Sequence, residues 1–414
     1  MKVQLIQAPS ESKDLRNERW FTPMGLISTG TYLGNFDYEV EIFDGLHYPL
    51  DYILNRINAD IVGINFNIFS TSSMDRIAEQ AKKQGSLVVV GGQAATPLTK
   101  QLLQGNKNID LVVRYDGEEA LRQIADRVKE GSNDFWGIPN IAYRKAGNIV
   151  EEKIEKIEIE KLPIPHRKIK GINLEKYIDF WVGDSSIRAT NTFTKRGCNR
   201  ACSFCARIDK GIRARTPEQV FEEDKKLVEE FKVNYIWEMS DTYFTDINWL
   251  RRFRKIYESN GGLPVKYWAF CDIRDINKET VEIMSALNVD KVCVGIESGN
   301  EEIRRNNGKN FTNKEVYEAV KLLGKAGITL EDSYVLGLMG ENEETIKQTY
   351  KLSQQVAKLC KTERTAYNLI LPLPGSPIWQ RMMQIPALQS KYGQEYRFDV
   401  EELRKDFISY FCNL

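Results

Sequence analysis

Three of the seven cysteines in this chain lie within eight residues, as Cys198, Cys202 and Cys205 in a C-x3-C-x2-C spacing. Three thiolates on one short segment can bind three irons of a cubane cluster, because soft sulfur ligands suit iron–sulfur clusters. The fourth iron then has no protein ligand, and cluster-based activation of a substrate requires such an open site. The spacing therefore predicts a site-differentiated [4Fe–4S] cluster.

The competing interpretation of these cysteines is a zinc knuckle. Zinc usually takes four nitrogen or sulfur ligands from paired motifs. The chain offers no second cysteine pair, and its two histidines, His47 and His166, lie far away in the sequence. The other four cysteines are scattered, and most lie in apolar patterns typical of buried thiols. Clustered cysteines in a chain without a secretory pattern favour metal or redox chemistry over disulfides.

A series of strand and helix patterns follows the first 185 residues and would position the cysteines. Candidate strands occur at 192–194, 235–239, 265–270, 291–296, 333–338 and 366–371. Helical patterns at 217–231, 247–257, 278–287, 314–326 and 342–357 separate them. Six βα units predict a partial (β/α)6 barrel over residues 186–375, with chemistry at the carboxyl ends of its strands. The aromatic and charged segment 376–414 is expected to cap that mouth.

Residues 1–135 form an earlier α/β unit. Strand patterns at 3–8, 38–44, 61–66, 87–90 and 111–115 alternate with helical ones. This alternation predicts a doubly wound, Rossmann-like parallel sheet, in which ligands bind beyond the carboxyl ends of the strands. Residues 136–185 are expected to hold a small hairpin and a charged linker between the two domains. The fold class is therefore α/β.

The cysteine segment, with Phe204 just before the third cysteine, resembles the motif of the radical S-adenosylmethionine (SAM) superfamily. The resemblance implies that SAM binds the open iron through its amino and carboxylate groups. It further implies reductive cleavage of SAM to a 5′-deoxyadenosyl radical, and an external electron donor of the flavodoxin or ferredoxin type.

Several later strand ends resemble the SAM contacts of that superfamily. The implied SAM-binding residues are Phe204, Glu238, Ser240, Asp241, Arg274, Glu297, Ser298 and Gly337. An arginine can grip a carboxylate with two hydrogen bonds, and an acid at the end of an apolar strand is costly unless it is paired. Alternative interpretations stay open for two of these positions: Asp241 could cap a helix, and Arg274 could form a surface salt bridge.

The doubly wound domain before such a barrel resembles the cobalamin-binding module of class B radical SAM enzymes. The implied cobalamin-binding residues are Asn65, Ser70, Thr71, Ser72, Gly91, Gly92, Gln93, Tyr115, Gly117 and Glu118. The D-x-H-x-x-G loop that supplies a cobalt-ligating histidine is absent, because His47 follows Asp44 at the wrong spacing. No G-x-G-x-x-G follows the first strand, so nicotinamide and flavin have no support. A scaffold that has lost its ligand is the alternative.

The resemblance leads to one principal function and two alternatives. The principal function is a cobalamin-dependent methyltransferase that acts on an unactivated carbon of a small molecule. The first alternative is a radical SAM dehydratase, epimerase or rearrangement enzyme that acts on a sugar-like metabolite, and the second is a non-catalytic metal-binding protein.

The charge balance of the chain bears on its partners and location. Lys plus Arg and Asp plus Glu both number 58, which gives no reason to expect a nucleic-acid or polybasic membrane surface. No apolar stretch approaches the roughly 18 residues of a membrane span, and the N-terminus does not resemble a signal peptide. A cytoplasmic protein is therefore expected.

Overall fold

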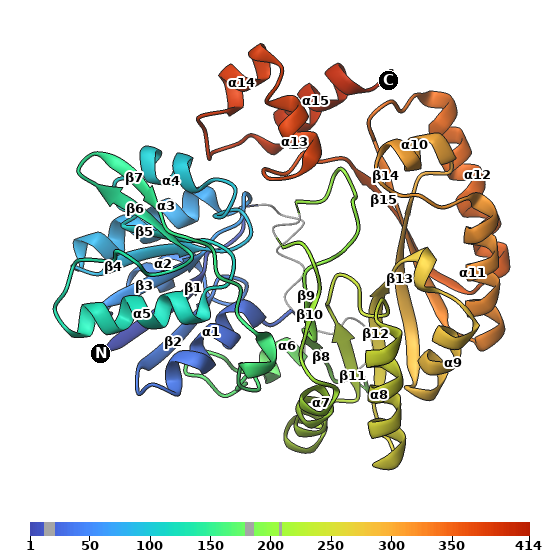
Figure 1. Ribbon diagram of the computed structural model, residues 1–414, viewed down its shortest axis with the longest axis horizontal. Helices are drawn as coiled ribbons and strands as arrows, with labels where there is room; N and C mark the ends of the chain where they lie inside the picture. The colour runs from blue at the N-terminus through green and yellow to red at the C-terminus, as the bar shows by residue number, and fades with distance from the viewer. Residues whose placement is uncertain (12–20, 179–185, 207–208) are drawn as a thin grey trace. The chain divides into compact units, whose positions relative to one another are not determined.

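The computed structural model describes residues 1–11, 21–178, 186–206 and 209–414. The chain divides into two compact units, residues 1–182 with 386–398, and residues 183–385 with 399–414. Each unit is built around one mainly parallel sheet, which confirms the predicted α/β class (Figure 1). Among the described residues, no helix is both long and apolar enough to span a bilayer.

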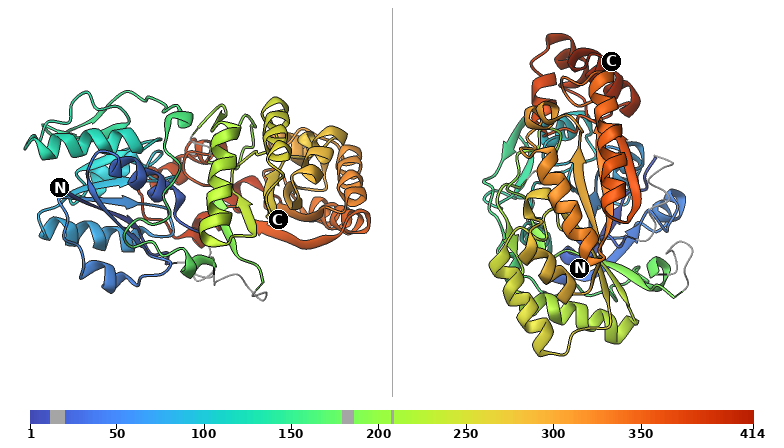
Figure 2. Two further views of the ribbon diagram at one scale, coloured as in Figure 1. Left: turned by 90° about the horizontal axis from the view of Figure 1, so that it is seen from below. Right: turned by 90° about the vertical axis from the view of Figure 1, so that its right-hand side faces the viewer.

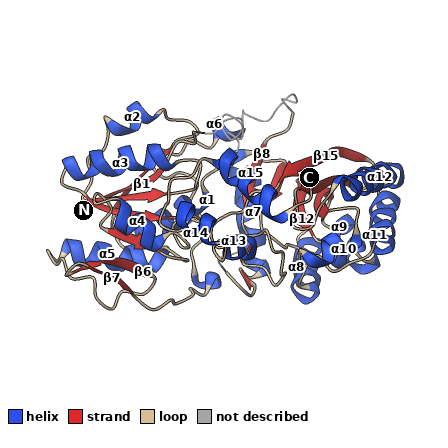
Figure 3. Ribbon diagram, turned by 90° about the horizontal axis from the view of Figure 1, so that it is seen from above, coloured by secondary structure: helices blue, strands red, loops and turns tan. Residues whose placement is uncertain are grey.

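The first unit contains the five parallel strands expected from the sequence, in the order β2-β1-β3-β4-β5. Its elements are β1 (Lys2–Gln7), α1 (Met24–Gly34), β2 (Glu39–Asp44), α2 (Leu50–Leu54), β3 (Ile61–Asn65), α3 (Thr71–Lys83), β4 (Leu87–Gly91), α4 (Thr99–Gly105), β5 (Leu111–Val113) and α5 (Glu118–Lys129). Helix α1 packs beside α5. Helix α2 packs beside α3, as Figure 3 shows. Right-handed crossovers on the two sides of β1 place these pairs on opposite faces, as in a doubly wound sheet.

The expected hairpin consists of β6 (Ile141–Lys145) and β7 (Asn148–Glu151), but it does not stand apart from the first domain. β6 pairs antiparallel with β5, so the hairpin extends the first sheet to seven strands. An isolated two-stranded hairpin is marginally stable in water, and the free edge of β5 supplies the partner that it needs. Residues 179–185, at the end of the expected linker, lie outside the described residues.

The segment after the hairpin also belongs to the first unit. It holds a short 3-10 turn, η2 (Ile159–Lys161), and the helix α6 (Glu175–Ile178). The buried Tyr177 hydroxyl of α6 donates to Asp44 Oδ2 at 2.6 Å, at the end of β2. Residues predicted to form a linker are therefore packed onto the first sheet.

The second unit has six parallel strands in the order β15-β14-β13-β12-β11-β8, together with the two-stranded ribbon β9–β10. Its strands are β8 (Ala189–Thr192), β9 (Lys195–Arg196), β10 (Arg213–Ala214), β11 (Tyr235–Glu238), β12 (Lys266–Cys271), β13 (Val289–Glu297), β14 (Thr329–Leu336) and β15 (Thr362–Leu369). In the described part of the chain, β8 and β15 each pair with one strand of this sheet. The sheet is thus open, as predicted for a partial barrel.

Helices cover the outer side of the second sheet (Figures 1 and 2). They are α7 (Pro217–Phe231), α8 (Ile247–Ser259), α9 (Lys278–Ala286), α10 (Glu301–Asn306), α11 (Asn313–Ala326) and α12 (Glu343–Leu359), with the 3-10 turn η3 (Ile273–Asp275) after β12. Capping boxes begin α7 at Thr216 and α11 at Thr312, which explains why their predicted starts agree closely. The six-residue α10 was not predicted, because so short a helix has little periodicity.

The C-terminal segment is shared between the two units, which differs from the expectation that all of residues 376–414 cap the barrel. α13 (Pro377–Met382) and α15 (Val400–Phe411) belong to the second unit, whereas α14 (Pro386–Tyr392) belongs to the first. In α15, Arg404 Nε donates to the carbonyl of Ile370 at 3.0 Å, beyond the end of β15. In the first unit, Arg397 forms a 2.7 Å ion pair with Asp75 of α3. Specific polar contacts thus divide the segment.

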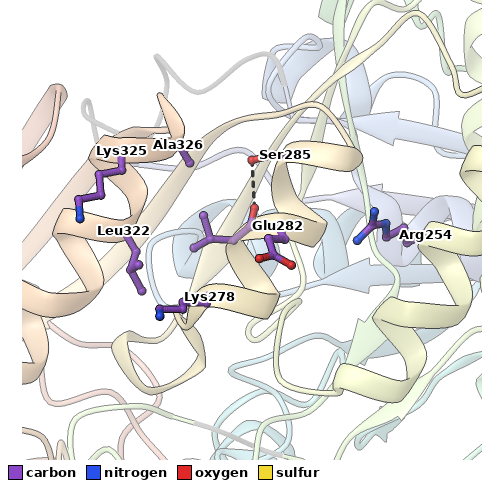
Figure 4. Close-up of a pocket in the computed structure, with 8 residues that line it drawn as sticks. Arg254, Lys278, Glu282, Ser285, Leu322, Lys325 and Ala326 are labelled. Atoms are coloured by element: carbon purple, nitrogen blue, oxygen red, sulfur yellow. Dashed lines mark hydrogen bonds between the residues drawn. The ribbon is translucent and has the colours of Figure 1, made fainter.

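A surface hollow lies among α8, α9 and α11 (Figure 4). Its lining residues are Arg254, Lys278, Val281, Glu282, Ser285, Leu322, Lys325 and Ala326. The Ser285 hydroxyl is bonded within α9, where it donates to the carbonyl of Val281 at 3.0 Å. Because these residues belong to the outer helical layer, and not to the carboxyl ends of the strands, the hollow is not a candidate for the predicted chemistry.

Candidate active site

The three cysteines lie on the loop between β9 and β10, beyond the carboxyl end of β8. Gly197 has a φ of +85°, and a Cβ there would lie 2.2 Å from the carbonyl oxygen of Gly211. Only glycine therefore allows the two arms of the loop to approach this closely. A bridge between Cys198 and Lys210 closes the stem. The location agrees with the predicted site at the mouth of the barrel.

The thiols differ in their surroundings. Cys205 is exposed, whereas Cys198 and Cys202 are half-buried, and all three are outside disulfides. Burial raises the pKa of Cys202, and the nearby Lys309 opposes that rise. Within the part of the chain that the structure describes, no three His, Cys, Asp or Glu side chains converge on one metal position. The three thiols on this one loop are the sulfur ligands that the predicted cluster would use.

Glu238 ends β11 and supports the start of the cysteine loop. Its Oε1 accepts hydrogen bonds from the Thr194 backbone amide at 2.9 Å and from the Ser240 hydroxyl at 2.8 Å. Ser240 Oγ in turn accepts from the backbone amide of Lys195 at 2.8 Å. Glu238 and Ser240, which were predicted to contact SAM, thus hold the start of the loop by hydrogen bonds. Asp241, the third predicted residue here, is exposed. Glu238 Oε2 is buried and has no hydrogen-bond partner among the described residues.

Lys195 is a buried cation at the base of the cysteine loop. Its Nζ donates to the carbonyl of Tyr243 at 2.6 Å and lies 4.5 Å from the centroid of the Trp249 ring. Burial lowers the pKa of Lys195 to about 8, although the charge of Glu238 acts in the opposite direction. The lysine therefore ties the loop stem to the segment that follows β11.

Arg274, predicted to hold the SAM carboxylate, is paired with its own neighbour. Its Nε and Nη2 donate to the two carboxylate oxygens of Asp272 at 2.7 and 2.6 Å. Asp272 is buried, which raises its pKa, but the hydrogen bonds from Arg274 and the charge of Lys309 lower it overall to about 2. The salt-bridge interpretation of Arg274 thus describes its contacts in this structure.

Glu297 and Lys309 form a buried ion pair at the end of β13. Lys309 Nζ lies 3.0 Å from Glu297 Oε1 and donates to the carbonyl of Gly295 at 2.9 Å. Glu297 has a φ of +69°, a left-handed conformation that costs on the order of 1 kcal/mol for a non-glycine residue. Its carboxylate folds back over Gly295, where a Cβ would lie 2.2 Å from Glu297 Oε1. The strain is typical of functional sites.

Sequence reasoning found Glu297 but missed Lys309, which comes twelve residues later, after α10. Burial disfavours the Lys309 ammonium group, yet the charges of Glu297, Cys202 and Asp272 outweigh burial and raise its pKa. A lysine in a polar turn is ordinary in sequence. Its burial and its ion pair with Glu297 depend on the folded chain, in which the residues after α10 return to the end of β13.

Of the remaining predicted SAM residues, Ser298 and Gly337 follow the neighbouring strands β13 and β14. Phe204 is half-buried within the cysteine loop. Ser298 is fully buried, and its hydroxyl lies 3.2 Å from Thr349 Oγ1 of α12, so it helps to join β13 to that helix. Gly337 follows β14 with a φ of +86° and donates its amide to Glu341 Oε2 at 2.5 Å. Glu341 Oε1 is buried and without a hydrogen-bond partner in the described residues.

In the first unit, the ends of β3, β4 and β5 bring several predicted cobalamin residues together. Gly92 has a φ of +105°, and a Cβ there would lie 2.2 Å from Asn65 Oδ1. Gly91 accepts a 2.8 Å hydrogen bond from the backbone amide of Phe66. Tyr115 has a φ of +60°, and its amide donates to Thr96 Oγ1 at 3.0 Å. The backbone is thus closely packed and locally strained at this edge.

The other predicted cobalamin residues have varied surroundings. Ser70 and Thr71 are buried and bonded within their own loop, through the carbonyls of Asn67 and Ile68. The backbone amide of Ser72 donates to Glu11 Oε1 at 2.6 Å.

Glu118, Gly117 and Gln93 lie close to the same edge. Glu118 is buried and accepts a 2.7 Å hydrogen bond from Ser28 of α1, so in this structure it joins α1 to α5. Gly117 precedes α5, and Gln93 is exposed.

Comparison with protein families assigns both units. Residues 193–353 match the radical SAM superfamily, and residues 20–125 match the B12-binding domain. The chain carries a B12-binding domain and a radical SAM domain. Its cofactors are therefore a [4Fe–4S] cluster, SAM and cobalamin, and it is a radical SAM enzyme.

Two curated relatives of this radical SAM enzyme cover most of its length. An uncharacterized methyltransferase of Pyrococcus horikoshii, PH0819, is 25% identical over 99% of this chain and 92% of its own. The bacteriochlorophyllide d C-12(1)-methyltransferase of Chlorobaculum tepidum is 24% identical over 87% of this chain and 73% of its own.

Two solved structures share the fold of the radical SAM enzyme over nearly its whole length. The radical SAM methyltransferase TsrM from Kitasatospora setae, solved with cobalamin and a [4Fe–4S] cluster, aligns with a TM-score of 0.77. That alignment is 19% identical and covers 93% of this chain and 78% of TsrM. The cobalamin-dependent radical enzyme OxsB aligns with a TM-score of 0.76 at 16% identity, over 95% of this chain and 61% of OxsB.

The residues at both sites fit these cofactors. Three thiols on one loop are the donor set that a site-differentiated cluster needs. Glu238 at the end of β11 and Glu341 in the loop after β14 each present a buried carboxylate oxygen that lacks a partner among the described residues. Buried polar atoms are normally satisfied, so two such oxygens in this region indicate a polar ligand. In the first unit, Gly91 and Gly92 leave the backbone at the end of β4 without side chains.

We expect Glu238→Gln to change the pH dependence of stability. Burial raises the pKa of Glu238 to about 7. The protonated carboxyl therefore contributes stability that is complete below its unfolded pKa, near 4.5, and is lost as the pH rises through 7. Between pH 5 and pH 8 the wild type should lose on the order of 3 kcal/mol relative to the variant. Urea unfolding at both pH values measures this, and parallel pH profiles would contradict it.

Proposed function

We propose that this radical SAM enzyme is a cobalamin-dependent methyltransferase that adds a methyl group to a carbon of a small molecule. The observation that carries the proposal is that one chain holds two sites. The barrel contains the strained, buried Glu297–Lys309 ion pair, and the B12-binding domain contains a strand end with glycines. Two relatives that are described as methyltransferases, and that align with most of this chain, support the proposal.

The Glu297–Lys309 pair suits the amino-acid end of SAM. That end carries an ammonium group and a carboxylate, and the pair offers one charge of each sign within 3.0 Å. Glu297 would hold the ammonium group and Lys309 the carboxylate, which fixes the orientation of the cofactor beside the cysteine loop. The turn that carries Lys309 touches that loop, because a Cβ on Gly308 would lie 2.0 Å from the carbonyl oxygen of Ala201.

Each domain would have its own part in the reaction. When bound, the cluster supplies the electron that cleaves SAM, and cobalamin carries the methyl group that is transferred. In the barrel, Glu238, Ser240 and Lys195 keep the cysteine loop seated on β11. In the first domain, Gly92 would allow the corrin to approach the backbone at the end of β4, and Asn65 and Tyr115 would lie at its edge.

A small-molecule substrate is supported by a structural neighbour, because TsrM has also been solved with its substrate tryptophan. We propose that electrons reach the cluster from a flavodoxin or ferredoxin type of protein.

The deciding experiment is anaerobic turnover of enzyme loaded with iron, sulfide and cobalamin, with SAM that carries a deuterated methyl group. Mass spectrometry should show the label in a product, with S-adenosylhomocysteine and 5′-deoxyadenosine both formed. Deoxyadenosine without S-adenosylhomocysteine would instead favour a dehydratase, epimerase or rearrangement enzyme. Turnover by folded enzyme that takes up no corrin would contradict the proposal.

A glycine-to-alanine change at Gly92 should weaken cobalamin binding selectively. The added Cβ would meet Asn65 Oδ1 at 2.2 Å, and the φ of +105° disfavours any side chain. We expect the cobalamin content after reconstitution to fall about 10-fold while the iron content is unchanged, because the cysteine loop belongs to the other unit. Visible spectra and iron assays measure both. Gly131→Ala is the control, since its φ is +74° and a Cβ there meets nothing within 4 Å.

A further inference from the structure

The two spans between the cysteines are each tied to a different, distant element of the second unit. We infer that Asp275 and Asn307 are positioning residues, which hold these spans so that the three thiols are presented to the cluster together. The inference rests on the cluster-binding loop alone, and it does not depend on methyl transfer as the outcome of the reaction.

Asp275 holds the span between Cys198 and Cys202. Arg200, in the middle of that span, donates from Nη2 to both carboxylate oxygens of Asp275, at 2.6 and 2.7 Å. The Thr245 hydroxyl donates to Asp275 Oδ2 at 3.2 Å, which orients the carboxylate. Both charged side chains are largely buried, so solvent screens their attraction only weakly.

The same arginine also faces Asp272, whose carboxylate lies 3.6 Å from Arg200 Nε. Because Arg274 occupies both oxygens of Asp272, Asp275 is the partner that Arg200 holds most closely. Asp272 caps the turn η3, beyond the end of β12, and Asp275 is the last residue of that turn. The span between Cys198 and Cys202 is therefore held by the turn η3, which follows β12.

Asn307 holds the span between Cys202 and Cys205. The Ser203 hydroxyl donates to Asn307 Oδ1 at 2.8 Å, and the Ser203 amide donates to the carbonyl of Asn307 at 3.0 Å. Asn307 is fully buried at the end of α10, and its side-chain amide donates to the carbonyl of Ile303 at 2.8 Å. The carbonyl of Ser203 accepts from the amide of Ile378 at 3.0 Å.

These contacts matter because the cluster needs all three thiolates of the loop at once. Drawing three side chains of one loop onto a cluster costs conformational entropy, and that cost falls when the spans between them are already fixed. Partners that orient metal ligands typically change metal affinity by about 10–100-fold when they are removed. Because Asp275 and Asn307 each hold a different span, loss of either one should cause only part of this change in cluster affinity.

The test uses full-length reconstituted enzyme with Asp275→Asn, and Glu279→Gln as the matched control. Glu279 also accepts two hydrogen bonds from an arginine, Arg251, at 2.6 and 3.0 Å, but on the exposed surface of α8 and α9. The rate of iron release to a chelator is measured under anaerobic conditions, with the electron paramagnetic resonance spectrum of the reduced cluster before and after SAM. Neither readout requires a substrate or cobalamin.

Asp275→Asn should release iron about 10-fold faster than the wild type and show an altered spectrum, whereas Glu279→Gln should match the wild type. Arg200→Gln, which removes the other partner and changes only a loop residue, should reproduce the effect even if Asp275→Asn folds poorly. Ser203→Ala should give a smaller increase, because the backbone bond to Asn307 is kept. Wild-type release rates and spectra in both Asp275→Asn and Arg200→Gln would overturn the inference.

Discussion

Replacement of Cys205 by alanine should leave an enzyme that folds but binds no intact [4Fe–4S] cluster and cleaves no SAM. Cys205 is exposed, so loss of its thiol removes no core packing, and the free energy of unfolding of the apo-protein should stay within about 0.5 kcal/mol of the wild type. The cluster needs all three thiolates to leave one iron open for SAM. Iron content, the visible spectrum and 5′-deoxyadenosine formation with dithionite measure the effect.

Cys360→Ala is the matched control for Cys205→Ala. Cys360 follows α12, is buried, and donates from its thiol to the carbonyl of Ile328 at 3.2 Å. Its loss should cost stability, on the order of 1 kcal/mol, but should keep the cluster and the SAM cleavage. A Cys205→Ala enzyme with full iron content and normal deoxyadenosine formation would show that another residue completes the site.

Replacement of Lys309 by methionine is expected to affect both stability and SAM binding. It leaves the Glu297 carboxylate buried without its partner, which costs about 3–5 kcal/mol. It also removes the cation proposed to hold the SAM carboxylate, which should weaken SAM binding about 10–100-fold. Chemical unfolding of the apo-protein and anaerobic calorimetric titration of the reconstituted enzyme with SAM separate the two effects.

Two further variants make the Lys309 prediction specific. Lys291→Met removes a 2.6 Å ion pair with Glu363 elsewhere on β13, where the partner is half exposed, and should cost at most about 1 kcal/mol without changing SAM binding. The double variant Glu297→Gln, Lys309→Met should recover part of the stability, since no unpaired charge remains, but not the affinity for SAM. If Lys309→Met and Lys291→Met bound SAM equally well, the assignment of Lys309 to the SAM site would be wrong.

The sequence was sufficient where the chemistry is local. The three cysteines occupy eight consecutive residues, so their spacing predicts a cluster before any fold is known. The parallel strands found among the described residues were also predicted, within a few residues at their ends, because β-strands and helices differ in the period of their apolar residues. The residues predicted to bind SAM and cobalamin came from the family resemblance, and the fold class led us to expect ligands at strand ends.

The sequence was not sufficient where a contact joins distant residues. Lys309 was not predicted as part of the site, because its ion pair with Glu297 joins residues twelve apart, at the end of β13 and beyond α10. The hairpin reads as part of a linker, because the free edge of β5 that receives it is a product of the folded sheet. The C-terminal segment reads as one cap, but ion pairs and hydrogen bonds assign its parts to different units.

The cysteine motif illustrates both sides of this difference. Residue type and spacing alone determined that the loop could hold a site-differentiated cluster. Tertiary structure decided what holds the loop: Arg200 meets an aspartate 75 residues later, and Ser203 meets an asparagine 104 residues later. Lys309 reaches Glu297 in the same way, only after α10 turns the chain back. Neighbouring residues are sufficient to determine which ligands a loop can offer to a metal. The burial and pairing of charges are determined only when strand ends from separate βα units meet at one edge of the sheet.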